Sequence, residues 1–102
     1  MEKSILNVVH ESAKGLNKAG VMDDVTMREF DALCLPPVKE YSPAQIKKIR
    51  AQNHVSQSVL AAYLNTSKYT VQKWESGEKK PSGPSLKLLN IVEKKGIQAL
   101  AV

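Results

Sequence analysis

The pattern of apolar and polar positions is helical along the whole chain. Apolar residues recur at intervals of three and four, and no stretch alternates between apolar and polar in the way that demands a strand. Only residues 21–25 are expected to be briefly extended. We therefore predict an all-α protein, with helices over residues 2–18, 27–34, 43–53, 57–64, 68–76 and 84–96.

The first predicted helix, residues 2–18, carries an apolar stripe. The stripe consists of Ile5, Val9, Ala13 and Leu16. Gly20 is placed to end the helix. Such a stripe either packs inside the protein or binds a partner, and the sequence leaves both interpretations open.

The second predicted helix begins at a capping box. Thr26 and Glu29 have the Thr-x-x-Glu spacing in which a hydroxyl and a carboxylate each satisfy a backbone N–H group. The apolar positions of this helix are Met27, Phe30, Leu33 and Cys34. Pro36 and Pro37 end it, because proline has no N–H and forces its predecessor towards an extended conformation. Residues 36–41 are then a linker.

Three serines mark the starts of the next three helices. Ser42 is followed by Pro43 at the first helical position and by Gln45, which together form a stronger capping box. Ser56 and Ser67 are good caps for the two helices that follow. The predicted core residues are Ile46, Ile49, Leu60, Ala61, Leu64, Val71, Trp74, Leu88, Leu89 and Val92, and the predicted outward residues of the first of these helices are Lys47, Lys48 and Arg50.

The helix over residues 68–76 has the features of a DNA-reading element. It follows a three-residue turn, Asn65-Thr66-Ser67, in which asparagine tolerates a left-handed conformation, and Gly77 can close its far end. Its outward side chains are Lys68, Tyr69, Gln72 and Lys73. These are long hydrogen-bonding groups on a helix narrow enough to enter a major groove.

Charge is distributed unevenly between the two parts of the chain. Residues 1–41 carry five Lys/Arg and seven Asp/Glu, a net −2, whereas residues 42–95 carry ten and three, a net +7. This asymmetry suggests that the basic part meets a polyanion and the acidic part meets something else. With 102 residues, the chain has room for one compact domain and an arm.

The chain lacks the residue clusters of an enzyme or a metal protein. Cys34 is the single cysteine, so neither an internal disulfide nor a zinc framework is expected, and we interpret it as a buried packing thiol. His10 and His54 have no recognisable nucleophile beside them. No apolar run is long enough to span a bilayer. We expect a cytoplasmic, non-enzymatic protein without cofactor or metal.

The residues of the basic part resemble a known family. The resemblance rests on Ser56-Gln57, the Leu60-Ala61 pair, Leu64, the run Val71…Trp74-Glu75-x-Gly77, and the Lys80-Pro81 loop, and it covers about residues 43–95. These positions resemble the lambda-repressor/Cro-like (Xre-type) helix-turn-helix family. Asn65 and Thr66 stand where that family often has a glycine and an aliphatic residue. With the extension that contains residues 27–35, the chain looks like the HigA/NadS-like antitoxin regulators.

The resemblance implies a fold, partners and contact residues. The expected organisation is an N-terminal helical arm and linker over residues 1–41, which makes a toxin or dimer contact, a helix-turn-helix domain over residues 42–96, and a tail or short helix over residues 97–102. The expected base contacts are Lys68, Tyr69, Gln72 and Lys73, and the expected phosphate contacts are Gln57, Thr70, Lys79 and Lys80.

The implied function is a homodimeric repressor that binds an inverted-repeat operator in double-stranded DNA. As an antitoxin, it would also regulate its own operon and neutralise a RelE/HigB-like toxin through the N-terminal arm. Two alternatives stay open. One is a stand-alone or phage-type repressor without a toxin, and the other is a protein-interaction adaptor on a helix-turn-helix scaffold.

Overall fold

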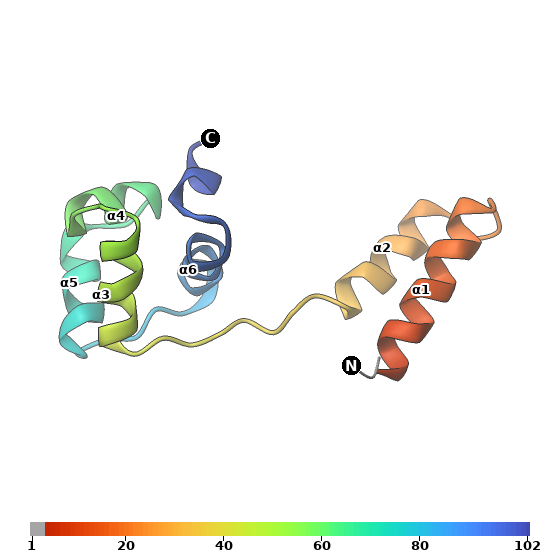
Figure 1. Ribbon diagram of the computed structural model, residues 1–102, viewed down its shortest axis with the longest axis horizontal. Helices are drawn as coiled ribbons and strands as arrows, with labels where there is room; N and C mark the ends of the chain where they lie inside the picture. Colours follow the sequence, from red (N-terminus) through yellow and green to blue (C-terminus); the bar gives the residue numbers. More distant parts are fainter. Residues whose placement is uncertain (1–3) are drawn as a thin grey trace. The chain divides into compact units, whose positions relative to one another are not determined.

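In the computed structural model, which describes residues 4–102, the chain is helical and those residues form no strand (Figure 1). The elements are α1 (Ile5–Lys18), α2 (Asp24–Leu33), α3 (Pro43–Gln52), α4 (Gln57–Tyr63), α5 (Lys68–Ser76), α6 (Gly83–Lys95) and the 3₁₀ helix η1 (Ile97–Leu100). The all-α prediction is confirmed. The predicted start of the first helix at Glu2 lies outside the described residues. The brief extended segment expected at residues 21–25 is wrong for Asp24 and Val25, which lie inside α2, whereas Asp23 before them is extended.

The chain forms two compact units, one that ends at Pro37 and one that spans Val38–Val102. The N-terminal unit is a hairpin of α1 and α2. The C-terminal unit contains α3 to α6 and η1. Residues 38–41, which the sequence places in the linker, thus belong to the C-terminal unit.

The start of α2 differs from the prediction. The cap is Asp23, whose carboxylate accepts a hydrogen bond of 2.7 Å from the Thr26 backbone N–H. That bond lowers the pKa of Asp23. A carboxylate is favoured at the positive end of a helix, so Asp23 takes the cap and Thr26 becomes a residue of the first turn.

A few polar contacts join the two helices of the hairpin. His10 Nε2 lies 2.7 Å from Asp31 Oδ1, and this bond holds the pKa of the Asp31 carboxyl below its usual range. The Asn17 side chain donates to Met22 O at 2.9 Å and so stabilises the turn between the helices. The Cys34 thiol donates weakly to Leu6 O at 3.8 Å. Cys34 is only half-buried, so the interpretation as a buried packing thiol is wrong.

The hairpin leaves most of its large apolar side chains in solvent. Among its described apolar residues, Ala13 and Met27 alone are buried. Leu33, one of the predicted apolar positions of the second helix, is 63% exposed. The other exposed residues are Ile5, Leu6, Val8, Val9, Leu16, Val21, Val25 and Leu35. Two amphipathic helices cannot enclose a large core between themselves alone. Of the predicted stripe of α1, Ala13 is therefore buried while Ile5, Val9 and Leu16 face solvent.

The C-terminal unit, by contrast, has a continuous core. It consists of Tyr41, Ile46, Ile49, Leu60, Ala61, Leu64, Val71, Trp74, Leu89, Val92 and Ile97. Leu88 is partly buried and packs against this core. The core predicted from the sequence is therefore confirmed. Burial of each large aliphatic side chain here contributes about 1.5–3 kcal/mol by removing apolar surface from water.

One ion pair crosses the interior of this unit. Arg50 Nε and Nη2 each donate to the Glu75 carboxylate at 2.9 Å, and the Glu75 side chain is only 3% exposed. Gln57 Nε2 donates to the same carboxylate at 3.3 Å. The hydrogen bond from Arg50 to Glu75 raises the pKa of the guanidinium. The prediction that Arg50 points outward is wrong, because Arg50 neutralises a buried carboxylate.

The segment before α3 is attached to α6 by the buried side chain of Asn90. Lys39 N–H donates to Asn90 Oδ1 at 2.8 Å, and Asn90 Nδ2 donates to Lys39 O at 2.9 Å. The Tyr41 hydroxyl donates to Glu93 Oε1 at 3.0 Å. These bonds hold residues 38–41 in the C-terminal unit and make the linker shorter than predicted.

We predict that Arg50→Met destabilises the protein by about 3–5 kcal/mol in urea denaturation, because it leaves the Glu75 carboxylate buried without its cation. Lys48→Met is the matched control, since it removes an exposed cation from the same helix. The double variant Arg50→Met, Glu75→Leu should recover most of the loss. Equal stability of the Arg50→Met and Lys48→Met variants would contradict the role of the pair.

We also predict that Ala61→Leu destabilises the fold by about 1–3 kcal/mol, because Ala61 is buried where α4 and α5 pack closely. Ala51→Leu places the same side chain at an exposed helical position and should be close to neutral. Thermal melts followed by circular dichroism compare the two. An unchanged melting temperature for Ala61→Leu would contradict close packing of α4 on α5 at this position.

The Tyr41 hydroxyl gives a pH-dependent prediction. Burial, with the neighbouring Glu93 carboxylate, raises the pKa of Tyr41 from 10.0 to about 12. The neutral phenol therefore stabilises the fold fully below pH 10, and this contribution is lost as the pH rises towards 12. Over that window the wild type should lose more unfolding free energy than Tyr41→Phe. Parallel losses in the two proteins would refute the assignment.

Candidate DNA-binding surface

The ends of α5 are fixed by local bonds that the sequence predicts. Ser67 caps the helix by accepting a hydrogen bond of 3.2 Å from Thr70 N–H. Gly77 ends it with a left-handed φ of 85°. Both predictions are confirmed.

The turn before α5 brings α4 and α5 together. Asn65 has a φ of 54°, the left-handed conformation expected of it. Thr66 N–H donates to Ala61 O at 2.9 Å and so ties the turn back to α4. The inward face of α5 then packs on the core through Val71 and Trp74, and the opposite face of the helix points to solvent. This is helix-turn-helix geometry.

The four predicted base-contacting residues lie together on the outward face of α5. Lys68 and Lys73 are exposed, Tyr69 is 72% exposed and Gln72 is half-buried. Tyr69, Gln72 and Lys73 line a shallow hollow of 300 Å³, together with Ser76 and Glu78. The face thus offers two ammonium groups, a phenol and an amide, which are suited to the hydrogen-bonding edges of bases.

The four predicted phosphate-contacting residues are less uniform. Lys79 and Lys80 are exposed on the loop after α5, and Lys79 N–H donates to Lys73 O at 3.2 Å, which ties this loop to the helix. Gln57 stands at the start of α4 but is half-buried, and its Nε2 already donates to Glu75. The Thr70 hydroxyl lies 2.9 Å from Ser67 Oγ. Of these four residues, Lys79 and Lys80 are exposed, whereas Gln57 and Thr70 are half-buried.

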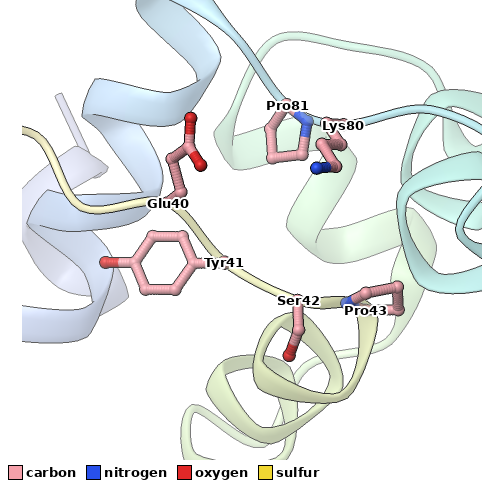
Figure 2. A pocket seen from close by; sticks show the side chains of 6 residues that line it. All are labelled: Glu40, Tyr41, Ser42, Pro43, Lys80 and Pro81. Atoms are coloured by element: carbon pink, nitrogen blue, oxygen red, sulfur yellow. The ribbon is translucent and has the colours of Figure 1, made fainter.

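Figure 2 shows a pocket beside this loop, with a volume of 340 Å³. The segment before α3 contributes Glu40, Tyr41 and Ser42, the first residue of α3 contributes the Pro43 ring, and the loop after α5 contributes Lys80 and Pro81. The Tyr41 ring lines the pocket, but its hydroxyl points towards α6 (Figure 2), where it bonds Glu93. The pocket therefore presents one carboxylate and one ammonium group, and we assign it no chemistry.

Sequence reasoning missed the residues that position α5 from inside. Arg50 and Glu75 hold α3 against α5, and Gln57 links α4 to the same carboxylate. One signal was available, because Glu75 lies four residues after Val71 and so falls on the buried face of the helix. Asn90 carried no comparable signal.

Neither a metal-binding cluster nor a membrane-spanning helix is found in the described part of the chain. Among residues 4–102, no group of three or more His, Cys, Asp or Glu side chains is arranged to hold a metal ion. None of the helices within that range has the length and the apolar character needed to cross a membrane.

Comparison with known proteins agrees with this geometry. Residues 46–92 match the family described as Helix-turn-helix. A stretch of 53 residues, 52% of this chain, is 40% identical to Antitoxin HigA-2 of Vibrio cholerae serotype O1. The chain spans about half of that relative's length, 51%. Residues 46–92 therefore form a helix-turn-helix domain of the lambda-repressor-like, Xre type, and a stretch of the chain is similar in sequence to a HigA antitoxin.

Proposed function

We propose that the protein is a sequence-specific DNA-binding repressor that inserts α5 into the major groove. The observation that carries the proposal is the outward face of α5, where Lys68, Tyr69, Gln72 and Lys73 lie together on a helix packed on a helix-turn-helix core. The net charge of +7 over residues 42–95 supports it, because a basic domain is attracted to the phosphate backbone.

Each outward residue has a role that follows from its chemistry. Lys68 and Lys73 donate to the N7 and O6 acceptors of guanine, and Gln72 pairs with adenine. The Tyr69 ring contacts a thymine methyl group, or its hydroxyl contacts a phosphate. These residues read the bases and so determine which operator is bound.

A second set of residues positions the domain on the backbone. Lys79 and Lys80 contact phosphates that flank the site, and the start of α4, with Gln57, approaches another. The Gln57 amide has two N–H donors, so one stays available for phosphate while the other is bonded to Glu75. Thr70, in the first turn of α5, makes a further phosphate contact. These contacts add affinity without distinguishing sequences.

We further propose that the repressor acts as a homodimer on an inverted repeat. Two copies related by a twofold axis present their α5 helices to successive major grooves, so the half-sites should be about one helical turn, or 34 Å, apart.

The N-terminal hairpin supports the second part of the proposal, which is an antitoxin role. Its described residues leave nine large apolar side chains exposed and bury two apolar ones, and it belongs to the acidic part of the chain. An apolar acidic surface suits a basic protein partner, such as a RelE/HigB-like toxin that binds RNA. The likeness of the chain to an antitoxin points the same way. The complex would then regulate its own operon.

We predict that Lys73→Ala weakens binding to the DNA upstream of the protein's own gene by about 1–3 kcal/mol, or roughly five- to 150-fold, because a base contact is lost. Fluorescence anisotropy with labelled DNA measures the change. Lys94→Ala is the matched control, since it removes an exposed lysine from α6. If both variants bind alike, α5 is not the reading element.

For Lys79 and Lys80 the expected effect is on the salt dependence. Each phosphate contact contributes about one unit to the slope of log affinity against log salt, so the double Lys79→Ala, Lys80→Ala variant should reduce that slope by about two units. It should weaken binding to operator and unrelated DNA alike. Salt-insensitive binding by the wild type would rule out this mechanism.

Deletion of residues 1–35 separates the two parts of the function. The Val38–Val102 unit keeps its core and the Asn90 bonds, so DNA binding should change little, whereas capture of the toxin should fail. The partner to test is a short basic RelE-like protein encoded next to this gene. Absence of such a gene would favour the stand-alone repressor, and hairpin-dependent partner binding without any DNA binding would favour the adaptor.

A further inference from the structure

We propose that Glu78 determines part of the sequence specificity of the DNA-binding surface, because its carboxylate accepts a hydrogen bond from the N4 amino group of a cytosine. The inference rests on the proposed function and adds an acidic contact to its basic and amide contacts. Glu78 follows Gly77, which ends α5, so it stands outside the helix that carries the other reading residues.

Glu78 shares a hollow with residues of the outward face of α5. The hollow has a volume of 300 Å³, and its other lining residues are Tyr69, Gln72, Lys73 and Ser76. These four have the i, i+3, i+4 and i+7 spacing of one helical face, so the hollow runs along the helix. Because Glu78 comes after the last residue of α5, its carboxylate lies at the C-terminal end of this hollow.

The backbone at Glu78 is held against the last turn of α5. Ser76 Oγ donates to Lys73 O at 3.1 Å, and Glu78 N–H donates to Ser76 Oγ at 3.4 Å. Lys79 N–H donates to the same Lys73 carbonyl at 3.2 Å. The chain segment that carries the carboxylate is therefore fixed before DNA is bound, which reduces the entropy lost on binding.

Glu78 also differs from the other acidic side chains of the basic part of the chain, of which there are three in all. Two are neutralised, Glu75 by Arg50 and Glu93 by Lys39. Glu78 is exposed, and in the described part of the chain it forms no ion pair. Of these three carboxylates, the one without a cation among the described residues thus lies on the surface proposed to meet DNA.

This position is electrostatically unfavourable for a carboxylate in two ways. The C-terminal end of a helix carries partial negative charge, which disfavours an anion there. A carboxylate also repels the phosphate backbone that the lysines of this surface attract. Such a local conflict is expected where function requires it. A hydrogen-bond donor on the DNA would compensate both effects.

The chemistry of a carboxylate selects the base. An ionised carboxylate only accepts hydrogen bonds. In the major groove, guanine presents two acceptors and thymine presents one beside its methyl group, so both bases repel it. Adenine has a donor at N6, but its N7 acceptor lies next to that donor. Cytosine presents its N4 donor without an acceptor, and it is therefore the base that fits Glu78.

The test compares the duplexes that the full chain and its variants select from a library of randomised DNA. The wild type should enrich a consensus with a cytosine in each half-site. Glu78→Ala removes the acceptor, so it should lose the preference at that position and keep the others. Glu78→Lys should enrich guanine there instead, because an ammonium group donates to O6 and N7.

Fluorescence anisotropy then measures the size of the effect. Replacement of the selected C·G pair should weaken wild-type binding by about five- to 150-fold, whereas Glu78→Ala should bind the two duplexes within about twofold of each other. Glu29→Ala is the matched control, since it removes an exposed carboxylate from α2, and it should keep the wild-type preferences. Because the Glu78 side chain is exposed, circular-dichroism melts of its variants should match that of the wild type.

Three results would overturn the proposal. They are unchanged base preferences in Glu78→Ala, an equal gain of affinity for every duplex, which indicates repulsion of the backbone alone, and loss of a preference for adenine in place of cytosine. A wild type that enriches no sequence at all would contradict the proposed function itself, and this inference with it. That result is distinct from the three above, in each of which the wild type selects a consensus.

Discussion

Three helices of the C-terminal unit meet at the carboxylate of Glu75. Arg50 reaches it from α3 with two parallel hydrogen bonds, and Gln57 reaches it from α4 with a third. Aliphatic contacts tolerate small sliding movements, but a bidentate pair in a water-poor interior loses much of its energy when its geometry changes. We infer that this interaction fixes the angle at which α5 stands, while the apolar core supplies the bulk of the stability.

That constraint divides α5 into two faces with separate tasks. Val71, Trp74 and Glu75 bind the helix to the rest of the unit, and the outward residues Lys68, Tyr69 and Lys73 are exposed. Substitutions on the outward face can therefore change a proposed operator preference at little cost to the fold. The N-terminal hairpin is organised differently, because its large apolar residues are available for contact and few of them serve its own packing.

Local features were predictable from the sequence, and long-range ones were not. Ser42, Ser56, Ser67 and Gly77 act within a few residues, so their sequence neighbours already determine what they do. The ion pair joins residues 25 positions apart, and the Asn90 bonds join residues 51 apart, so neither is visible until the helices are packed. The start of α2 was missed for another reason, since two acceptable caps, Asp23 and Thr26, compete over a short distance. The contacts proposed for Lys68, Tyr69, Gln72 and Lys73 remain predictions, although their shared exposure follows from helical periodicity.

The bonds between Asn90 and Lys39 have a mechanical consequence. Any force applied to the N-terminal unit, for instance by a bound partner, passes along the chain and reaches Lys39 before it reaches α3. There two hydrogen bonds between the Lys39 backbone and the Asn90 side chain resist the force, and the hydrogen bond from the Tyr41 hydroxyl to Glu93 resists it as well. These bonds must therefore break before a pulling force on the N-terminal unit reaches α3 and the Arg50–Glu75 pair that orients α5.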